Sequence, residues 1–238
     1  MPIAFDYQPP TTPLQILHQD KDLLVLAKPS GLLTNPGRGA HLADSLLSRV
    51  QQEFPQALLV HRLDAATSGI VVMALRRKAE AHLKQQFANR QVNKVYLARV
   101  WQQPAVAAAE ILLPLCADLT SPPKNKVCWQ QGKTAQTFYR MLPETATPEH
   151  ALLALFPHTG RAHQLRVHMQ SIGHPILGDA LYGHADARNA APRLLLHATQ
   201  LQLQHPYSGA MLEFCHWPDQ TEFQLEASPH LSWLQRPA

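Results

Sequence analysis

The chain has 238 residues, 45% of them hydrophobic and 16% charged, with a net charge of +4 at pH 7. This length and composition suit a substantial buried core and exclude the disordered, collagen-like and coiled-coil classes. No apolar run reaches 18 residues and residues 1–6 lack a basic or apolar stretch, so we expect neither a membrane span nor a secretory signal.

The alternation of apolar and polar residues predicts many short strands and few helices. In chain order, strands are expected at 14–18, 23–27, 58–60, 70–75, 94–100, 134–141, 151–156, 193–196, 201–203 and 211–214. Helices are expected at 45–54 behind an Asp44 cap, at 78–88 and at 164–171. This pattern favours an α+β fold with a largely antiparallel sheet, in a single domain spanning residues 1–238.

Positive charge is concentrated in the middle of the chain. Residues 61–166 contain 14 Lys or Arg and 6 Asp or Glu, a net of +8, whereas the other residues have a net of −4. A protein that attracts a phosphate backbone with one face needs such an asymmetry. A generic solvated basic surface explains the same charges, so charge alone leaves both interpretations open.

The cysteines and histidines indicate neither a disulfide framework nor a metal site. The three cysteines are odd in number and form no C-x-x-C pair, which fits a reducing cytosol. The 14 histidines are scattered, and His163 and His168 are five apart, so no H-x-x-x-H or H-E-x-x-H motif occurs. We therefore expect no metal and a cytoplasmic location.

A polar loop, His61-Arg62-Leu63-Asp64-Ala65-Ala66-Thr67-Ser68-Gly69, separates two of the expected strands. A nearby cation typically lowers a carboxylate pKa by about 1–3 units, and hydroxyl or backbone donors lower it further, so Asp64 is expected to be ionised. Loops at strand ends are also where catalytic groups are often displayed. An Arg and an Asp two residues apart are, however, usually a structural ion pair, and both interpretations stay open.

Three other clusters combine polar and cationic residues. Arg166 and His163 lie within one turn of the helix expected at 164–171, so they share a face. Tyr96 lies on an expected strand between Lys94 and Arg99, where it either stacks on a base or fills the core. The Gly and Pro content of 173–183 predicts a fixed turn whose backbone approaches another group closely.

Five motifs in this order resemble the RluA family of pseudouridine synthases. They are H-R-L-D-x-x-T-S-G from His61, K-x-Y-x-A from Lys94, G-R-x-H-Q-L-R-x-H from Gly160, G-H-P-I-x-G-D-x-x-Y-G from Gly173, and L-L-L-H-A from Leu194. The resemblance extends from about Lys28 to Ala198 and beyond. The tracts 36–38, 126–128 and 191–198 are similar to the small member of the family that acts on both large-subunit ribosomal RNA and transfer RNA.

The resemblance implies a pseudouridine synthase catalytic domain with a central active-site cleft. It implies an isomerase that breaks the N1 to C1′ bond of a uridine within RNA, turns the base and rejoins it through C5, with no cofactor and no essential metal. The nucleophilic Asp of the family falls on Asp64, its active-site Tyr on Tyr96, and the Arg paired with the catalytic carboxylate on Arg166.

The resemblance also implies how RNA is bound. Arg62 matches the residue thought to enter the stem and help extrude the target base, at a flipping cost of a few kcal/mol. The other expected RNA contacts are His61, Arg161 and His163. Many family members begin with an S4 domain, but Lys28 comes too early to leave room for one, so we expect a monomer that selects RNA with its catalytic domain alone. The implied partners are a large-subunit ribosomal RNA hairpin and a transfer RNA anticodon stem-loop.

Three alternatives remain at this stage. A catalytically silent RNA-binding protein on the same fold is disfavoured by the intact set of Asp64, Tyr96 and Arg166. An Asp-dependent hydrolase of a small nucleoside would not need the +8 segment, and its binding would depend far less on salt. A synthase restricted to ribosomal or to transfer RNA is the third. Whether Asp64 attacks C6, attacks C1′ or assists elimination to a glycal is not decided by the sequence.

Overall fold

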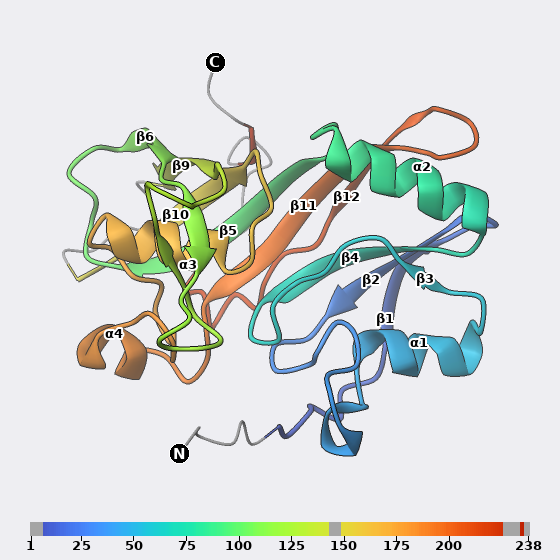
Figure 1. Cartoon of the computed structure of the whole chain (residues 1–238), viewed down its shortest axis with the longest axis horizontal. Coiled ribbons are helices and arrows are strands. Elements are labelled where there is room, and N and C mark those ends of the chain that lie inside the picture. Colours follow the sequence, from blue (N-terminus) through green and yellow to red (C-terminus); the bar gives the residue numbers. More distant parts are fainter. Residues whose placement is uncertain (1–6, 143–148, 226–233, 236–238) are drawn as a thin grey trace. The chain divides into compact units, whose positions relative to one another are not determined.

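The computed structural model describes residues 7–142, 149–225 and 234–235 (Figure 1). The chain forms two compact units, an N-terminal unit of Met1–Gln91 with Leu203–Phe214 and a C-terminal unit of Val92–Gln202 with Cys215–Ala238. The expectation of a single domain over residues 1–238 stays a prediction. In the described residues, no helix is long and apolar enough to cross a membrane.

The N-terminal unit is built on an antiparallel sheet in the order β1-β2-β4, with β3 also paired to β4. These strands are β1 (Gln15–Gln19), β2 (Leu23–Lys28), β3 (Leu58–Leu59) and β4 (Ser68–Ala74), and the unit also takes in most of β12 (Met211–Cys215). Every residue of β2 and β4 is buried, which explains their continuous apolar runs.

Helix α1 (Leu46–Glu53) begins one residue later than the predicted Asp44 cap implies. Ser45 is the N-cap, and it forms a reciprocal capping box with Ser48. Asp44 instead forms an ion pair with Arg49 at 2.7 Å. Two acceptors were available to cap this helix, and the serine takes the role because the Asp44 carboxylate is held by the guanidinium. A short 3₁₀ helix, Ala40–Leu42, precedes α1.

Helix α2 (Arg77–Ala88) packs against β3 and β4 (Figure 1). Ala79 and Leu83 are buried on its inner face. Gln86 is also buried and uses both ends of its amide on the backbone of Gln204, donating from Nε2 at 2.8 Å and accepting at Oε1 at 2.9 Å. The helix is thereby fixed to the segment at 203–214, which is distant in sequence but belongs to the same unit.

The C-terminal unit is a larger antiparallel sheet in the order β11-β5-β10-β9-β6, with a separate hairpin of β7 and β8. Its strands are β5 (Asn93–Trp101), β6 (Ala108–Leu112), β7 (Leu115–Ala117), β8 (Asn125–Val127), β9 (Gln136–Leu142), β10 (His150–Pro157) and the part of β11 (Leu196–Gln204) up to Gln202. Its helices are α3 (Gln164–Ser171) and α4 (Ala185–Asn189). Leu97, Leu152, Ala154 and Phe223 are among the residues of its main core.

The α+β prediction is confirmed, and every strand pairing named above is antiparallel. The prediction of two strands at 193–196 and 201–203 is wrong, because β11 is one continuous strand. The register of β11 against β5 shifts between Ala198 and Gln200, as at a β-bulge. The polar residues at this point suggested a break between two strands. The short elements β6, β7, β8 and α4 were not predicted. β6 begins at Ala108, inside the Pro-, Gln- and Ala-rich segment 102–109, whose composition is typical of a loop.

Candidate active site

The loop that carries Asp64 is fastened inside the N-terminal unit by a buried lysine. Lys28, at the end of β2, is 1% exposed. Its Nζ donates hydrogen bonds to the carbonyl oxygens of Pro29 at 2.9 Å, Leu32 at 2.7 Å and Ala65 at 2.9 Å. A buried ammonium is costly unless its donors are satisfied, and here three are. Lys28 thus ties its own turn to the residue that follows Asp64.

Three residues close to Lys28 in the sequence also form hydrogen bonds to the backbone of the Asp64 loop. Thr34 Oγ1 donates to the Leu63 carbonyl at 2.7 Å and accepts the Leu63 N–H at 3.1 Å. Ser30 Oγ donates to the Ala66 carbonyl at 2.7 Å, and Gly31 N–H donates to the Ala65 carbonyl at 2.8 Å. The residues on both sides of Asp64 are therefore fixed, which restricts the direction of its half-buried side chain.

Arg62 and His61 have different environments in this loop. The Arg62 side chain is exposed, as a residue that enters RNA must be. His61 Nε2 accepts the backbone N–H of Val72 at 3.0 Å, and its ring stacks on Phe87 of α2 with centroids 4.6 Å apart. His61 therefore has an internal structural role within the unit, and its expected contact with RNA stays a prediction.

In the C-terminal unit, the start of α3 is held by Gln164. This buried side chain accepts from Thr159 Oγ1 at 2.7 Å and from the Arg161 N–H at 3.0 Å, and it donates to the Gln136 carbonyl at 3.0 Å. His163 is the N-cap in a left-handed conformation with φ 54°. The helix is where the sequence predicted it, but His163 stands at its boundary rather than within its first turn.

Arg166, on α3, forms a buried bidentate ion pair with Asp179. Arg166 Nε donates to Asp179 Oδ2 at 2.8 Å, and Arg166 Nη2 donates to Asp179 Oδ1 at 2.7 Å. The Arg166 side chain is 5% exposed and the Asp179 side chain 0%. Oδ1 also accepts the N–H groups of Leu181 and Tyr182. Such fork geometry fixes the plane of the guanidinium as well as its position.

Gly178 allows Asp179 to take this place. Its φ is +71°, and a Cβ there would collide with the carbonyl oxygen of Arg193. The Gly178 N–H donates to the Ala187 carbonyl at 2.8 Å. A left-handed residue that approaches another backbone this closely has to be glycine.

Tyr182 connects His163 to Arg166. Its ring lies 5.2 Å from Arg166 Cζ, in cation–π geometry, and meets the His163 ring edge to face. Its hydroxyl accepts the Asn125 N–H at 2.8 Å and is hydrogen bonded to His163 Nδ1 at 2.7 Å. The prediction that His163 and Arg166 share a face of α3 is consistent with this, since one side chain contacts both.

Tyr96 lies on β5 with its backbone opposite Leu155 of β10 and Ala198 of β11. The neighbours Val95 and Leu97 point into the main core, so Tyr96 is on the other face of the strand, where it is half-buried. Lys94 shares that face, and burial lowers the pKa of its ammonium to about 8. A Cβ at position 160 would lie 4.0 Å from Lys94 Nζ, so the Gly160-Arg161 turn passes beside this cation.

The structure brings together some of the expected site residues and adds others. Within the C-terminal unit it groups His163 and Arg166 around Tyr182, and it leaves Arg161 exposed, with Nε donating to the Thr134 carbonyl at 3.1 Å. Asp64, Arg62 and His61 belong to the N-terminal unit. Sequence reasoning missed Lys28, Asp179 and Tyr182 as supporting residues. Asp179 and Tyr182 stand in the motif from Gly173, and Lys28 stands where the resemblance begins.

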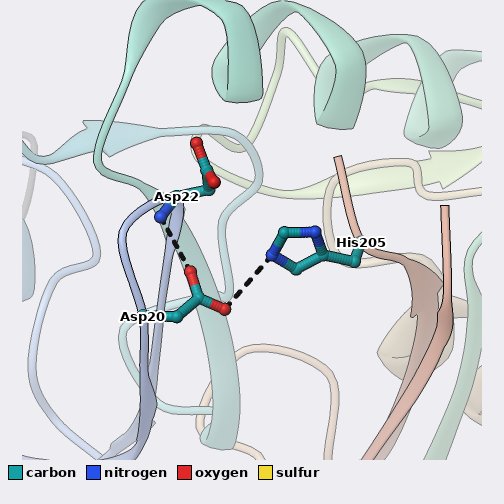
Figure 2. Close-up of side chains that lie close together, drawn as sticks. All are labelled: Asp20, Asp22 and His205. Carbon is teal, nitrogen blue, oxygen red and sulfur yellow. Dashed lines mark hydrogen bonds and ion pairs between the residues drawn. The ribbon is translucent and has the colours of Figure 1, made fainter. Parts of the chain in front are cut away.

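Among the residues that the structure describes, one group of side chains has the spacing of a metal site, and hydrogen bonds explain why these side chains lie together. Oxygen atoms of Asp20 and Asp22 and a nitrogen of His205 lie within 4.8 Å of one another (Figure 2). His205 Nδ1 accepts the N–H groups of Tyr207 and Ser208, so its proton is on Nε2, which donates to Asp20 Oδ2 at 3.2 Å. A metal on Nε2 would need a proton on Nδ1 and would break both backbone bonds. The cluster therefore joins two turns of the N-terminal unit.

The fold and these motifs define a class of RNA-modifying isomerase. The family model for RNA pseudouridylate synthase matches residues 22–171, and the chain belongs to this family. The dual-specificity RNA pseudouridine synthase RluA of Escherichia coli K12 is 50% identical over 210 residues, covering 88% of this chain and 95% of that protein. The protein of the same name from Vibrio vulnificus is 45% identical over 207 residues, which are 85% of this chain and 83% of that protein.

Solved structures agree with this assignment. The human RNA pseudouridylate synthase domain containing 1 superposes with a TM-score of 0.73 at 29% identity, covering 94% of this chain and 92% of that one. The human RNA pseudouridylate synthase domain containing 4 has a TM-score of 0.72 at 27% identity, over 90% and 95% of the two chains. The predicted family and fold class are confirmed.

Proposed function

We propose that this enzyme isomerises uridines in both large-subunit ribosomal RNA and the transfer RNA anticodon stem-loop, acting as a cytoplasmic monomer. The observation that carries this proposal is the 50% identity, over nearly their whole length, to relatives named for dual specificity. The +8 charge of residues 61–166 supplies the attraction that a phosphate backbone requires.

In this proposal Asp64 is the nucleophile. A carboxylate nucleophile has to be held in one direction, and the bonds from Lys28 and Thr34 to the residues beside Asp64 support that. The carboxylate attacks C6 of the uracil, attacks C1′ of the ribose, or assists elimination to a glycal, and in each route the N1 to C1′ bond breaks and C5 replaces N1. No step requires a redox change.

Tyr96 and Arg166 act on the same uridine in this proposal. Tyr96 contacts the uracil and removes a sugar proton, and its half-buried position opposite the core side of β5 supports this role. Arg166 pairs with the nucleophilic carboxylate, and its bidentate bond to Asp179 supports a guanidinium fixed in advance. Arg62, exposed in the Asp64 loop, fills the gap left by the extruded base, while His61, Arg161 and His163 contact the RNA.

The test uses two hairpins that share one local sequence, an anticodon stem-loop and a large-subunit ribosomal RNA hairpin. Pseudouridine formed in each is mapped with purified enzyme. Product in both supports the proposal, and product in only one removes dual specificity. Product in neither, with RNA still bound, supports the silent binding protein. Mapping pseudouridines in total RNA of a strain without the gene then identifies the natural sites.

A further inference from the structure

The β7–β8 hairpin of the C-terminal unit brings two thiols together. Cys116 stands in β7 opposite Lys126 of β8, and Cys128 follows β8, where its N–H donates to the Pro114 carbonyl at 2.8 Å. Residues two apart on a strand lie on the same side, so the positions of Cys116 and Cys128 share one face of the hairpin. Each thiol shifts the pKa of the other, and both side chains are partly exposed.

The two thiols are chemically unequal. The backbone N–H of Gln131, then the Cys116 thiol, and to a lesser extent the N–H groups of Gln130 and Gly132 hold the pKa of the Cys128 thiol below its ordinary value. The pKa of Cys116 is raised, chiefly by burial and then by its bond to Cys128. A thiolate is the reactive form of cysteine, so Cys128 is the nucleophile of the pair.

The turn around Cys128 depends on Gly132. The Gly132 N–H donates to the Cys128 carbonyl at 2.9 Å, and a Cβ at position 132 would collide with that oxygen. The charged groups beside the pair are Lys126 and Asp118, which form an ion pair at 3.1 Å. Their charges oppose each other, so the backbone N–H groups of the turn after Cys128 favour ionisation of Cys128 over Cys116.

We propose that Cys128 is a peroxide-reactive thiol and that Cys116 resolves the product into a disulfide across the hairpin. In the first step the Cys128 sulfur attacks one oxygen of hydrogen peroxide, the O–O bond breaks, and Cys128 sulfenic acid and hydroxide form. In the second step the Cys116 sulfur attacks the Cys128 sulfur, and the hydroxyl leaves with the Cys116 proton as water. The two electrons given up by the sulfurs reduce the peroxide.

This modification would act on an element that touches the candidate active site. Leu115 and Val127 of the hairpin pack with Val167 of α3 and with Tyr182, and Asn125 donates to the Tyr182 hydroxyl. The proposal itself rests on the thiols alone and does not depend on the proposed function.

The experiment exposes the reduced full-length protein to hydrogen peroxide and maps its cysteines by mass spectrometry. Wild type is expected to lose two hydrogens and to yield a linked Cys116–Cys128 peptide. With dimedone present, Cys116→Ser is expected to be labelled at Cys128 at least about tenfold faster than at the exposed Cys215. In Cys128→Ser, Cys116 is expected to react no faster than Cys215.

Three results would overturn the proposal: no linked peptide in wild type, equal labelling of Cys128 and Cys215, or a disulfide that appears only between two chains. Circular dichroism and thermal unfolding of the two serine variants check that each is folded. Because the readout is mass, failure of this inference is distinguishable from absence of synthase activity.

Discussion

The Asp64 loop and the start of α3 are two fixed regions that are held in different ways. Lys28, Ser30 and Thr34 hold the first by several bonds to main-chain carbonyls, each of which contributes about 1 kcal/mol. The second is held by the bonds of Gln164 and by one buried ion pair, Arg166 with Asp179. A distributed set of bonds tolerates a single loss, whereas removing one partner of a buried pair leaves an uncompensated charge. The two regions should therefore respond differently to single substitutions.

The largest expected effect on activity comes from Asp64→Asn, which removes the nucleophilic charge and keeps the shape of the side chain. Pseudouridine formation should fall below about 1% of wild type, since a covalent nucleophile supplies several kcal/mol. RNA binding and folding should be retained, because Asn keeps the shape of the side chain and the bonds of Lys28, Ser30 and Thr34 to the neighbouring carbonyls remain. Asp186→Asn is the matched control, because the Asp186 side chain on α4 is exposed. A rate above that limit contradicts the assignment.

The largest expected loss of stability comes from Asp179→Asn, at about 3–5 kcal/mol in the free energy of unfolding. Arg166→Met should cost a similar amount, and the double variant should cost clearly less than the sum, because no single charge is left buried. Chemical denaturation measures all three, and Asp186→Asn again serves as control. If Asp179→Asn costs less than about 1 kcal/mol, the pair does not hold α3 as described.

Substitutions of the residues that hold the Asp64 loop test the other half of the comparison. Lys28→Met removes the lysine donor from the Pro29 and Leu32 carbonyls and one of the two donors to the Ala65 carbonyl, and should cost about 2–4 kcal/mol. Thr34→Val should cost about 1–2 kcal/mol. Both should lower kcat more than RNA affinity, since they affect the direction of Asp64 rather than the charged surface. Lys78→Met, exposed on α2, is the control. A fall in affinity with an unchanged kcat would argue against this role.

Arg62→Ala separates base extrusion from chemistry at the same loop. Activity should fall about tenfold more on a folded stem-loop than on a substrate whose uridine is already loosely stacked, because flipping then costs less. Single-turnover rates on both substrates measure this, with Arg77→Ala as an exposed control. Equal losses on the two substrates would remove the flipping role.

The smallest expected effect is at Asp20. Burial raises its pKa, but bonds from His18 and from the N–H groups of Asp22 and Leu23 outweigh this and bring it to about 2. Because the folded pKa lies below the unfolded one, this stabilisation is present above about pH 4 and is lost as pH falls through 2. Asp20→Asn should cost about 1 kcal/mol at pH 7, after allowance for solvent screening, and almost nothing near pH 2. Urea denaturation at both values tests this, and an equal cost at both would contradict it.

Periodicity and motif order were sufficient to predict α3 to the residue and most of the long strands to within one or two. They were not sufficient for β7 and β8, because three-residue strands between prolines and lysines carry no period to detect. The pairing of Arg166 with Asp179 spans 13 residues across a turn that only Gly178 permits, and local spacing does not encode such a contact. The burial of Lys28 could not be predicted either, since burial of an ammonium depends on carbonyls that come together only in the fold.

The close approach of Gly178 to Arg193 also has a practical consequence for directed evolution. A library that randomises position 178 would consist almost wholly of inactive clones, since any side chain pushes the Arg193 backbone and drags the neighbouring Asp179 with it. Designs that recombine this enzyme with its relatives should inherit residues 173–193 as one block. A crossover between the glycine and the strand that follows would separate two main-chain segments that are shaped to each other.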